Sequence, residues 1–258
     1  MRIVSPLAAL LLFACAGAQK PAADDGARAR AHAAVDAPDR TPEDRALDAG
    51  RKPAETLVFL RLQPGMKVAE LGAGAGYTTE LLARSVAPDG VIYAQNPDLF
   101  IQRFLKTRWP DRLARPAMKN VVRVDREFDD PLPPEAKGLD VVLINVIYHD
   151  TTYMEVDRDK MNKAVFDALK PGGVYAVIDS SAKPGSGTAD SKTLHRIDEQ
   201  AVRAEVERAG FKLESSGDFL RNSQDARDWD SSPAAAASAG RRGQSDRFVL
   251  RFVKPRSP

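Results

Sequence analysis

Short apolar runs alternate with amphipathic stretches along most of the chain. The amphipathic stretches predict helices over residues 78–85, 100–109, 160–169 and 198–209. The apolar runs predict strands over residues 68–71, 91–94, 121–124, 141–147 and 174–178, with late strands near residue 219 and over residues 248–253. Because strands and helices alternate, the pattern favours an α/β fold with a mostly parallel sheet and right-handed crossovers.

Two helices are predicted ahead of this alternating region. Thr41 is suited to cap a helix and Pro42 fits its first turn, while a second helix begins at Pro53. Residues 19–40 are rich in Ala, Asp, Arg and Pro without apolar periodicity, which predicts a flexible tether. Residues 231–243 are rich in Ser, Pro, Ala and Gly, which predicts a mobile surface loop.

Composition narrows the class of protein. The chain has 258 residues, enough for one domain with appendages, and its 38 basic side chains nearly balance 36 acidic ones. A formal net charge of +2 gives no strong electrostatic attraction to nucleic acid. The single cysteine, Cys15, excludes an internal disulfide framework and a cysteine-based zinc cluster.

The N-terminus has the pattern of a secretory signal: a basic residue, an apolar run over residues 7–13 and a small-residue exit. Two processing routes fit residues 1–18. Cleavage after the A-x-A motif at residues 16–18 would leave a mature chain without cysteine, whereas a lipoprotein signal would place an acylated Cys15 at a membrane. The position of the lone cysteine favours the lipoprotein route. Either route predicts an exported protein, in the periplasm or anchored to a membrane; a buried N-terminal helix is the remaining alternative.

The strongest chemical signal is a glycine-rich turn over residues 70–79, which lies between a predicted strand and a predicted helix. Its spacing is G-x-G-x-G, the acid Glu70 stands two residues before the first glycine, and the Lys-Ser or Lys-Thr of a phosphate loop is absent. Glycines in such a turn allow the backbone to bend tightly and to approach a ligand that side chains would block. The turn is therefore a candidate ligand-binding loop.

With this turn, the sequence resembles the class I S-adenosylmethionine-dependent methyltransferases over about residues 66–253. The resemblance is also carried by Asp140 before the fourth strand, by residues 169–173 before the fifth, and by a final strand over residues 246–254. It implies a Rossmann-like sheet of seven strands, mostly parallel, with helices on both faces and a C-terminal antiparallel hairpin. The methyltransferase-like domain would cover residues 41–258. More narrowly, the chain is similar to exported bacterial predicted methyltransferases through residues 51–55, 148–150, 193–198 and 245–248.

The resemblance implies S-adenosyl-L-methionine as the cofactor. Glu70 would hold the cationic amino-acid end of the cofactor or order the loop. At the position of the family's ribose-binding acid this chain has Gln95-Asn96, and the neutral amide of Asn96 would bond a ribose hydroxyl more weakly than a carboxylate does. Asp125 is a candidate for the adenine amino group, with a solvated turn acid as the alternative. Backbone amides facing the methionine part and the ribose would come from Gly72, Gly74 and Gly76.

A methyl acceptor is expected at the end of the fourth strand, over residues 145–150, because open parallel sheets bind ligands outside the carboxyl ends of their strands. His149 is a candidate base for the acceptor proton, with Asp150 fixing its tautomer; the alternative is that both merely order the loop. His195 is a further candidate, after a candidate lid over residues 184–188. Two histidines with scattered acids predict no metal site.

Three functions fit these features. The first is an exported methyltransferase with a small-molecule or lipid-like acceptor. The second is a catalytically idle S-adenosylmethionine-binding or scaffold protein, favoured by Asn96 and by export away from a cytoplasmic cofactor. The third, a nicotinamide-dependent oxidoreductase, is disfavoured by the glycine spacing and by the lack of a Tyr-x-x-x-Lys pair. Residues 145–148 read N-V-I-Y rather than the N-P-P-Y of DNA amino-methyltransferases, which argues against nucleic-acid bases as acceptors.

Overall fold

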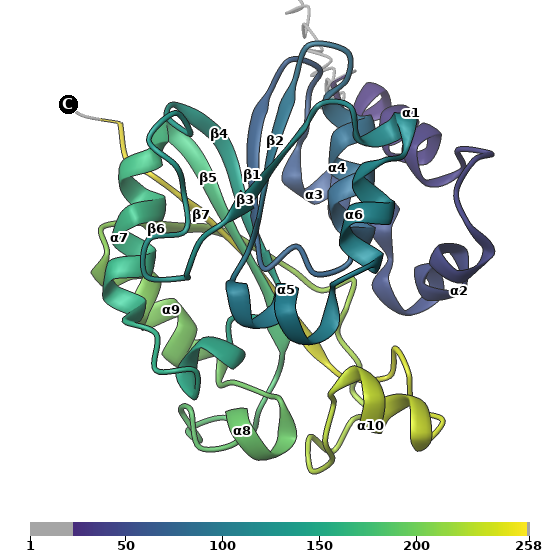
Figure 1. Cartoon of the computed structure of the whole chain (residues 1–258). Helices are drawn as coiled ribbons and strands as arrows, with labels where there is room; N and C mark the ends of the chain where they lie inside the picture. The colour runs from purple at the N-terminus through teal and green to yellow at the C-terminus, as the bar shows by residue number, and fades with distance from the viewer. Residues whose placement is uncertain (1–22, 257–258) are drawn as a thin grey trace, which may run out of the picture.

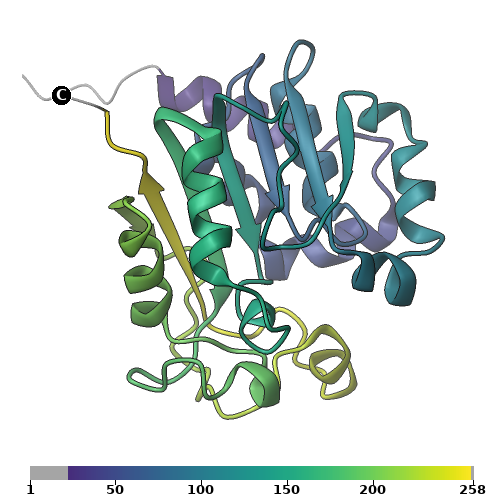
Figure 2. The same cartoon turned by 60° about the vertical axis from the view of Figure 1, so that its left-hand side comes forward.

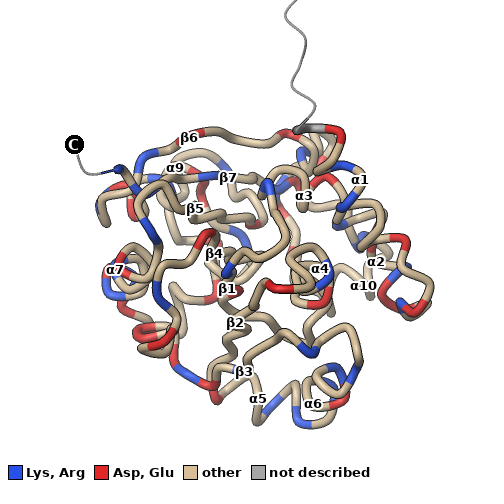
Figure 3. Tube along the Cα trace, turned by 90° about the horizontal axis from the view of Figure 1, so that it is seen from above, with Lys and Arg blue, Asp and Glu red and all other residues tan. Residues whose placement is uncertain are grey.

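A computed structural model describes residues 23–256 of the chain, so the predicted export signal and Cys15 lie outside the described residues. A central sheet lies between two groups of helices (Figure 1). No helix of the described residues is long and apolar enough to cross a bilayer. Basic and acidic residues are interspersed along the chain in the view of Figure 3, in line with the formal net charge of +2.

The sheet consists of β1 (Lys67–Leu71), β2 (Val91–Asn96), β3 (Val121–Asp125), β4 (Leu139–Asn145), β5 (Leu169–Ser180), β6 (Lys212–Gly217) and β7 (Arg247–Val253). Their spatial order is β3-β2-β1-β4-β5-β7-β6. The first five strands pair in parallel, whereas β7 runs antiparallel to both β5 and β6. Figure 2 shows β7 pointing opposite to the parallel strands. The fold class implied by the resemblance is therefore confirmed.

Helices cover both faces of the sheet (Figure 1). Successive residues of β1 point to opposite sides, since Val68 is buried in one apolar core and Ala69 in the other. The first core contacts α1 (Ala23–Val35), α3 (Pro53–Leu60), α4 (Tyr77–Val86) and α6 (Arg108–Leu113). The second contacts α7 (Arg158–Ala168) and α9 (Glu199–Arg208). The remaining helices are α2 (Pro42–Arg51), α5 (Asp98–Phe104), α8 (Ser191–Leu194) and α10 (Pro233–Ser238), and two 3-10 turns cover Pro116–Met118 and Asp150–Thr152.

The predicted flexible tether over residues 19–40 is wrong where the structure describes it. Residues Ala23–Val35 form α1, which packs against α3 and α4. Ala31 and Ala34, three residues apart on one face, are buried in the first core. Alanine favours a helix but has a small side chain, so a buried face made of alanines gives no pattern of large apolar residues in the sequence. The tether was predicted because this pattern is absent. The following N-terminus of α2 is confirmed, because the Thr41 hydroxyl accepts a hydrogen bond from the Asp44 amide at 3.2 Å.

Two other predicted elements differ from the structure for local reasons. The helix predicted over residues 100–109 is split into α5 and α6, because Pro110 would clash with the carbonyl four residues earlier in a continuous helix. In α6 it lies within the first turn, where its missing amide costs nothing. The surface loop predicted over residues 231–243 contains α10, capped by the Ser232 hydroxyl. The predicted strand end at residue 147 moves to Asn145, because Val146 has a φ of +58°.

Candidate active site

The predicted site residues lie at one end of the molecule, where the parallel strands end. Figure 1 shows this end at the bottom, with α5, α8 and α10 around it. The glycine loop follows β1, Asn96 ends β2, Asp125 ends β3 and His149 lies four residues after the end of β4. The carboxyl ends of parallel strands are where open α/β sheets bind ligands. The topology therefore places candidates that are far apart in sequence at one edge of the sheet.

The glycine loop is held by two side-chain amides at the end of β2. The Gln95 Oε1 accepts from the Gly72 amide at 2.9 Å. The Asn96 Oδ1 accepts from the Gly74 amide at 2.8 Å, and its Nδ2 donates to the Gly74 carbonyl oxygen at 3.1 Å. Both amide side chains are fully buried. The loop is thus fixed by β2 before any ligand binds, and Gln95 is a positioning residue to which the sequence analysis assigned no role.

The three loop glycines differ in what surrounds them. All three have positive φ, at +65° for Gly72, +58° for Gly74 and +82° for Gly76, a region that favours glycine. A Cβ on Gly72 would lie 2.8 Å from the Ile147 side chain, and a Cβ on Gly76 would lie 2.6 Å from the Trp109 ring. A Cβ on Gly74 would meet no atom within 4 Å. Gly72 and Gly76 are therefore required by packing, whereas Gly74 borders open space that a ligand could fill.

Asn96 and Asp125, the candidates for the nucleoside, are already engaged. Each polar atom of the Asn96 amide makes one bond to Gly74, so a bond to a ribose hydroxyl stays a prediction that would use the second lone pair of Oδ1 or the second N–H of Nδ2. The Asp125 carboxylate is partly exposed and forms an ion pair with Arg123 at 2.6 Å. This contact matches the alternative interpretation of Asp125 as a solvated turn acid.

Glu70 is buried beneath the loop and orders it. The Thr79 hydroxyl, in the first turn of α4, donates to the Glu70 Oε2 at 2.5 Å. Burial raises the pKa of Glu70 to about 7, against the hydrogen bonds from the threonines and the positive charge of Arg51, which lower it. The hydrogen bond from Thr79 supports the interpretation that Glu70 orders the loop. The positive charge of Arg51 also acts on the Glu70 carboxylate.

His149 lies between two carboxylates. Its Nδ1 is 2.7 Å from the Asp179 Oδ1, and its Nε2 is 3.2 Å from the Asp150 Oδ1. Burial alone would lower the pKa of His149, but the two carboxylates outweigh it and raise the pKa to about 10. Both ring nitrogens thus face a carboxylate, and the raised pKa favours the imidazolium form at neutral pH. An imidazolium has no free lone pair, so the base at His149 stays a prediction that requires a deprotonated ring, whereas the contacts fit the alternative in which His149 and Asp150 order the loop.

The structure brings His195 beside His149, with ring centroids 5.6 Å apart. The His195 Nδ1 is 2.9 Å from the Asp230 Oδ1, and the side chain is 28% exposed. Among the described residues, none makes a hydrogen bond to the His195 Nε2. A carboxylate on one nitrogen and a free second nitrogen is the usual arrangement of a histidine that takes up a proton. Asp179 and Asp230 were missed by the sequence analysis, although Asp179 directly follows a predicted strand.

Within residues 23–256 no group of three or more His, Cys, Asp or Glu side chains has the geometry of a metal site.

Arg196, next to His195, forms a fully buried ion pair with Asp225 at 2.8 Å. Arg196 also lies over the Trp229 ring, 4.8 Å from its centroid. This arginine therefore fixes the segment that carries His195 and Asp230 and is not available to a ligand.

The chain is similar in sequence and in fold to known methyltransferases. The sequence model of the family described as protein-L-isoaspartate(D-aspartate) O-methyltransferase matches residues 28–108. A protein-L-isoaspartate O-methyltransferase of Pyrococcus horikoshii is 27% identical over 146 residues, which are 57% of this chain and 59% of that protein. A crystal structure of a SAM-dependent methyltransferase from Aquifex aeolicus has a TM-score of 0.56 at 18% identity, covering 83% of this chain and 94% of that one. The fold is that of the S-adenosylmethionine-dependent methyltransferases.

We call the region between the glycine loop and the two histidines, His149 and His195, the crevice, and the family match covers only the side with the glycine loop. The family match includes the glycine loop and Asn96 but ends before β3, so it excludes His149 and His195. The chain also spans a little over half the length of the Pyrococcus horikoshii relative. The same fold occurs in the cyclase SpnF, with a TM-score of 0.54 at 15% identity over 83% of this chain and 81% of that one. The likeness to these structures shows the fold, and the activities named for the matched proteins differ from one another.

Proposed function

We propose that the protein is an S-adenosylmethionine-dependent methyltransferase with a small-molecule or lipid-like acceptor. The observation that carries the proposal is the open space at Gly74, in a glycine loop that β2 holds in place and Glu70 supports from below. A backbone exposed at a strand-to-helix turn is suited to contact a cofactor closely. The family match over residues 28–108 covers this loop and supports the same cofactor.

The acceptor side of the crevice fits a simple transfer. When bound, the cofactor supplies a methyl group on a positively charged sulfur, and an acceptor lone pair forms the new bond as the sulfur–carbon bond breaks. Much of the rate comes from holding the two reactants in line. His195 is placed to take the acceptor proton on Nε2 while Asp230 holds Nδ1. The imidazolium of His149, fixed by Asp150 and Asp179, acts as a positioning group beside it.

The proposed class of acceptor rests on the net charge and on the sequence at the end of β4. The near-neutral charge and the N-V-I-Y sequence over residues 145–148 favour a small or lipid-like acceptor over a nucleic acid. The matched family and the Pyrococcus horikoshii relative are named for a protein acceptor, so a protein acceptor is the main competitor. Incubation with labelled S-adenosylmethionine and envelope extracts would separate lipid, small-molecule and protein products by extraction. Label confined to protein or to nucleic acid would contradict the proposed class of acceptor.

A catalytically idle binding protein is the second candidate function. The specific observation in its favour is that Asn96 already bonds both polar groups of Gly74, so the position of the ribose-binding acid is committed to the loop. The two functions differ in turnover. The methyltransferase predicts that labelled methyl groups reach an acceptor and that His195→Gln lowers this transfer without changing cofactor affinity. The idle protein predicts cofactor binding without transfer.

The cofactor site is tested by two matched glycine substitutions. Gly74 and Gly138 both have positive φ, +58° and +66°, and a Cβ on either would meet no atom within 4 Å. The two substitutions therefore carry similar backbone strain, but Gly138 directly precedes β4, at the opposite end of the sheet. Gly74→Ala is expected to weaken S-adenosylhomocysteine binding by at least about tenfold, and Gly138→Ala to leave it unchanged. Equal affinities for both variants would contradict the assigned loop.

Export is a separate proposal, on residues outside those described. We propose that the N-terminal signal directs export and that Cys15 carries the lipid anchor, because it is the chain's single cysteine and follows the apolar run. Fatty-acid labelling of the full chain in cells tests this proposal. Label that disappears in Cys15→Ser supports it, and an unlabelled wild-type protein would contradict it.

A further inference from the structure

Two arginines lie together in the crevice without a carboxylate partner. Arg51 ends α2, and Arg247 begins β7. The Arg247 Nη1 donates to the carbonyl oxygen of Gly50 at 3.2 Å, which ties β7 to the residue before Arg51. The same two segments touch at their backbones, because a Cβ on Gly50 would lie 2.6 Å from the Gly243 Cα. The contact between distant parts of the chain brings the two guanidinium groups into one region.

Neither arginine has a direct ion-pair partner, although carboxylates act on both from a longer distance: Glu70 and Asp44 on Arg51, and Asp179 on Arg247. Of the described residues, no Asp or Glu oxygen lies within 4.0 Å of a nitrogen of Arg51 or Arg247. Arg51 lies over the Tyr77 ring, with its Cζ 4.4 Å from the ring centroid, and the Arg247 Nε donates to the Ser245 hydroxyl at 3.0 Å. Burial lowers the pKa of Arg247 to about 10, and the charge of Arg51 lowers it as well. The two partly buried like charges repel each other, and a bound anion would offset this repulsion.

The two arginines lie between the glycine loop and the histidines of the proposed site. Arg51 lines a small pocket together with Tyr77 and Thr78 of α4 and with Asn145, the last residue of β4. This pocket adjoins the glycine loop through α4, which begins directly after Gly76. On the other side, Arg247 pairs in register with Ser180, next to the Asp179 that holds His149. A ligand group between the arginines would thus lie between the cofactor loop and the histidines.

We propose that Arg51 and Arg247 together bind a carboxylate group of a ligand in the crevice. A guanidinium group presents a planar set of donors that matches two carboxylate oxygens, and two such groups compensate for the desolvation of the anion. The proposal rests on the proposed function only for the identity of the ligand. The carboxylate belongs either to the amino-acid end of the cofactor, whose ammonium group would then face Glu70, or to the acceptor.

Calorimetry with two nucleosides separates these sources. S-adenosylhomocysteine carries the amino-acid carboxylate, whereas 5′-methylthioadenosine lacks it. If the arginines bind the cofactor, Arg51→Met and Arg247→Met each weaken S-adenosylhomocysteine binding by about tenfold to a hundredfold and leave methylthioadenosine binding unchanged. Arg247→Lys, which keeps the charge but not the planar donors, is expected to lose less. Arg203→Met is the control, because Arg203 lies on α9 in a surface ion pair with Glu207.

If the acceptor supplies the carboxylate, the ratio of the two nucleoside affinities is unchanged in the variants. Succinate, added at constant ionic strength to protein saturated with S-adenosylhomocysteine, then raises the melting temperature of the wild type and of Arg203→Met but not of Arg51→Met or Arg247→Met. Variants that match the wild type in both measurements would overturn the carboxylate site. A wild-type protein that binds neither nucleoside would instead contradict the proposed function, and succinate titration of the free protein would still test the arginines.

Discussion

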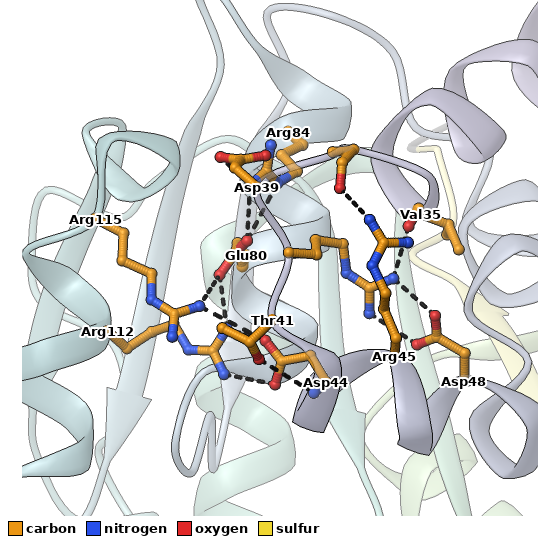
Figure 4. Close-up of polar contacts among 12 residues, drawn as sticks. Val35, Asp39, Thr41, Asp44, Arg45, Asp48, Glu80, Arg84, Arg112 and Arg115 are labelled. Carbon is orange, nitrogen blue, oxygen red and sulfur yellow. Dashed lines mark hydrogen bonds and ion pairs between the residues drawn. The ribbon is translucent and has the colours of Figure 1, made fainter.

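Two groups of arginines in this protein have opposite surroundings. In the paired cluster, which we define as Arg84, Arg112 and Arg115 with their acidic partners, every guanidinium contacts carboxylates (Figure 4). The Arg112 Nη1 is 2.5 Å from the Asp44 Oδ2 and 2.6 Å from the Glu80 Oε2. In the crevice, Arg51 and Arg247 have no such contact with any of the residues 23–256.

The difference indicates which charges serve the fold and which serve a ligand. The paired cluster joins α2, α4 and α6, so it fixes the N-terminal helices against the domain. Burial would raise the pKa values of Asp44 and Glu80, but the arginines outweigh it and hold both below their ordinary values. The crevice pair joins α2 to β7 through a backbone carbonyl, and neither of its guanidinium groups directly contacts a carboxylate. A guanidinium group without a direct carboxylate partner, at the end of the sheet where ligands bind, is available to bind an anionic group of a ligand.

The largest expected effect is the difference in stability between two variants, each of which lacks one arginine from one of the two groups. Arg112→Met leaves two buried carboxylates without their main partner and is expected to lower the free energy of unfolding by about 3–5 kcal/mol. Arg247→Met removes a charge without a direct ion-pair partner and is expected to change the free energy of unfolding by less than about 1 kcal/mol. Urea unfolding of both variants measures the difference. Equal losses would remove the distinction between the groups.

The next effect concerns His149, a cation that two carboxylates hold inside the crevice. Its pKa is raised to about 10 from an ordinary value of 6.5, so its stabilising contribution is complete below pH 6.5 and is lost as the pH rises toward 10. Unfolding measured across this range should show stability falling by roughly a few kcal/mol. His149→Gln should flatten the dependence. A wild-type stability that is constant from pH 6.5 to 10 would show that the ring is not charged in the folded protein.

Acid should act on the paired cluster and not on the crevice pair. The pKa values of Asp44 and Glu80 are lowered, so their contribution is present above their ordinary values of 3.8 and 4.5 and is lost as the pH falls below them. We expect an acid transition below about pH 4 that is weaker in Arg112→Met and unchanged in Arg247→Met. Circular dichroism during acid titration measures it, and identical curves for the two variants would argue against the assignment.

The smallest expected effect is at the outer edge of the paired cluster. Asp39 pairs with Arg84 at 2.8 Å, but its side chain is 59% exposed. Asp39→Asn is therefore expected to cost less than about 1 kcal/mol, and added salt should reduce the cost further. Urea unfolding at low and high salt measures both. A loss as large as that of Arg112→Met would mean that exposure does not separate the contributions of these pairs.

The sequence predicted the sheet and the glycine loop because both depend on local patterns. Apolar runs mark buried strands, and Gly72, Gly74 and Gly76 mark a turn with positive φ. The sequence could not predict which residues meet across the fold. Asp179 and Asp230 reach the histidines from β5 and from a late loop, and only the fold shows that two carboxylates occupy His149 while His195 keeps a free nitrogen. The pairing of Arg51 with Arg247, 196 positions apart, is likewise a product of topology.

The central claim is that the crevice binds S-adenosylmethionine at the loop around Gly74. Calorimetric titration of the full chain with S-adenosylhomocysteine tests it most directly, with NADH titrated in parallel. The account predicts saturable binding of S-adenosylhomocysteine at one site per chain and no saturable binding of NADH. Saturation by NADH, with no heat from either S-adenosylhomocysteine or S-adenosylmethionine, would contradict it.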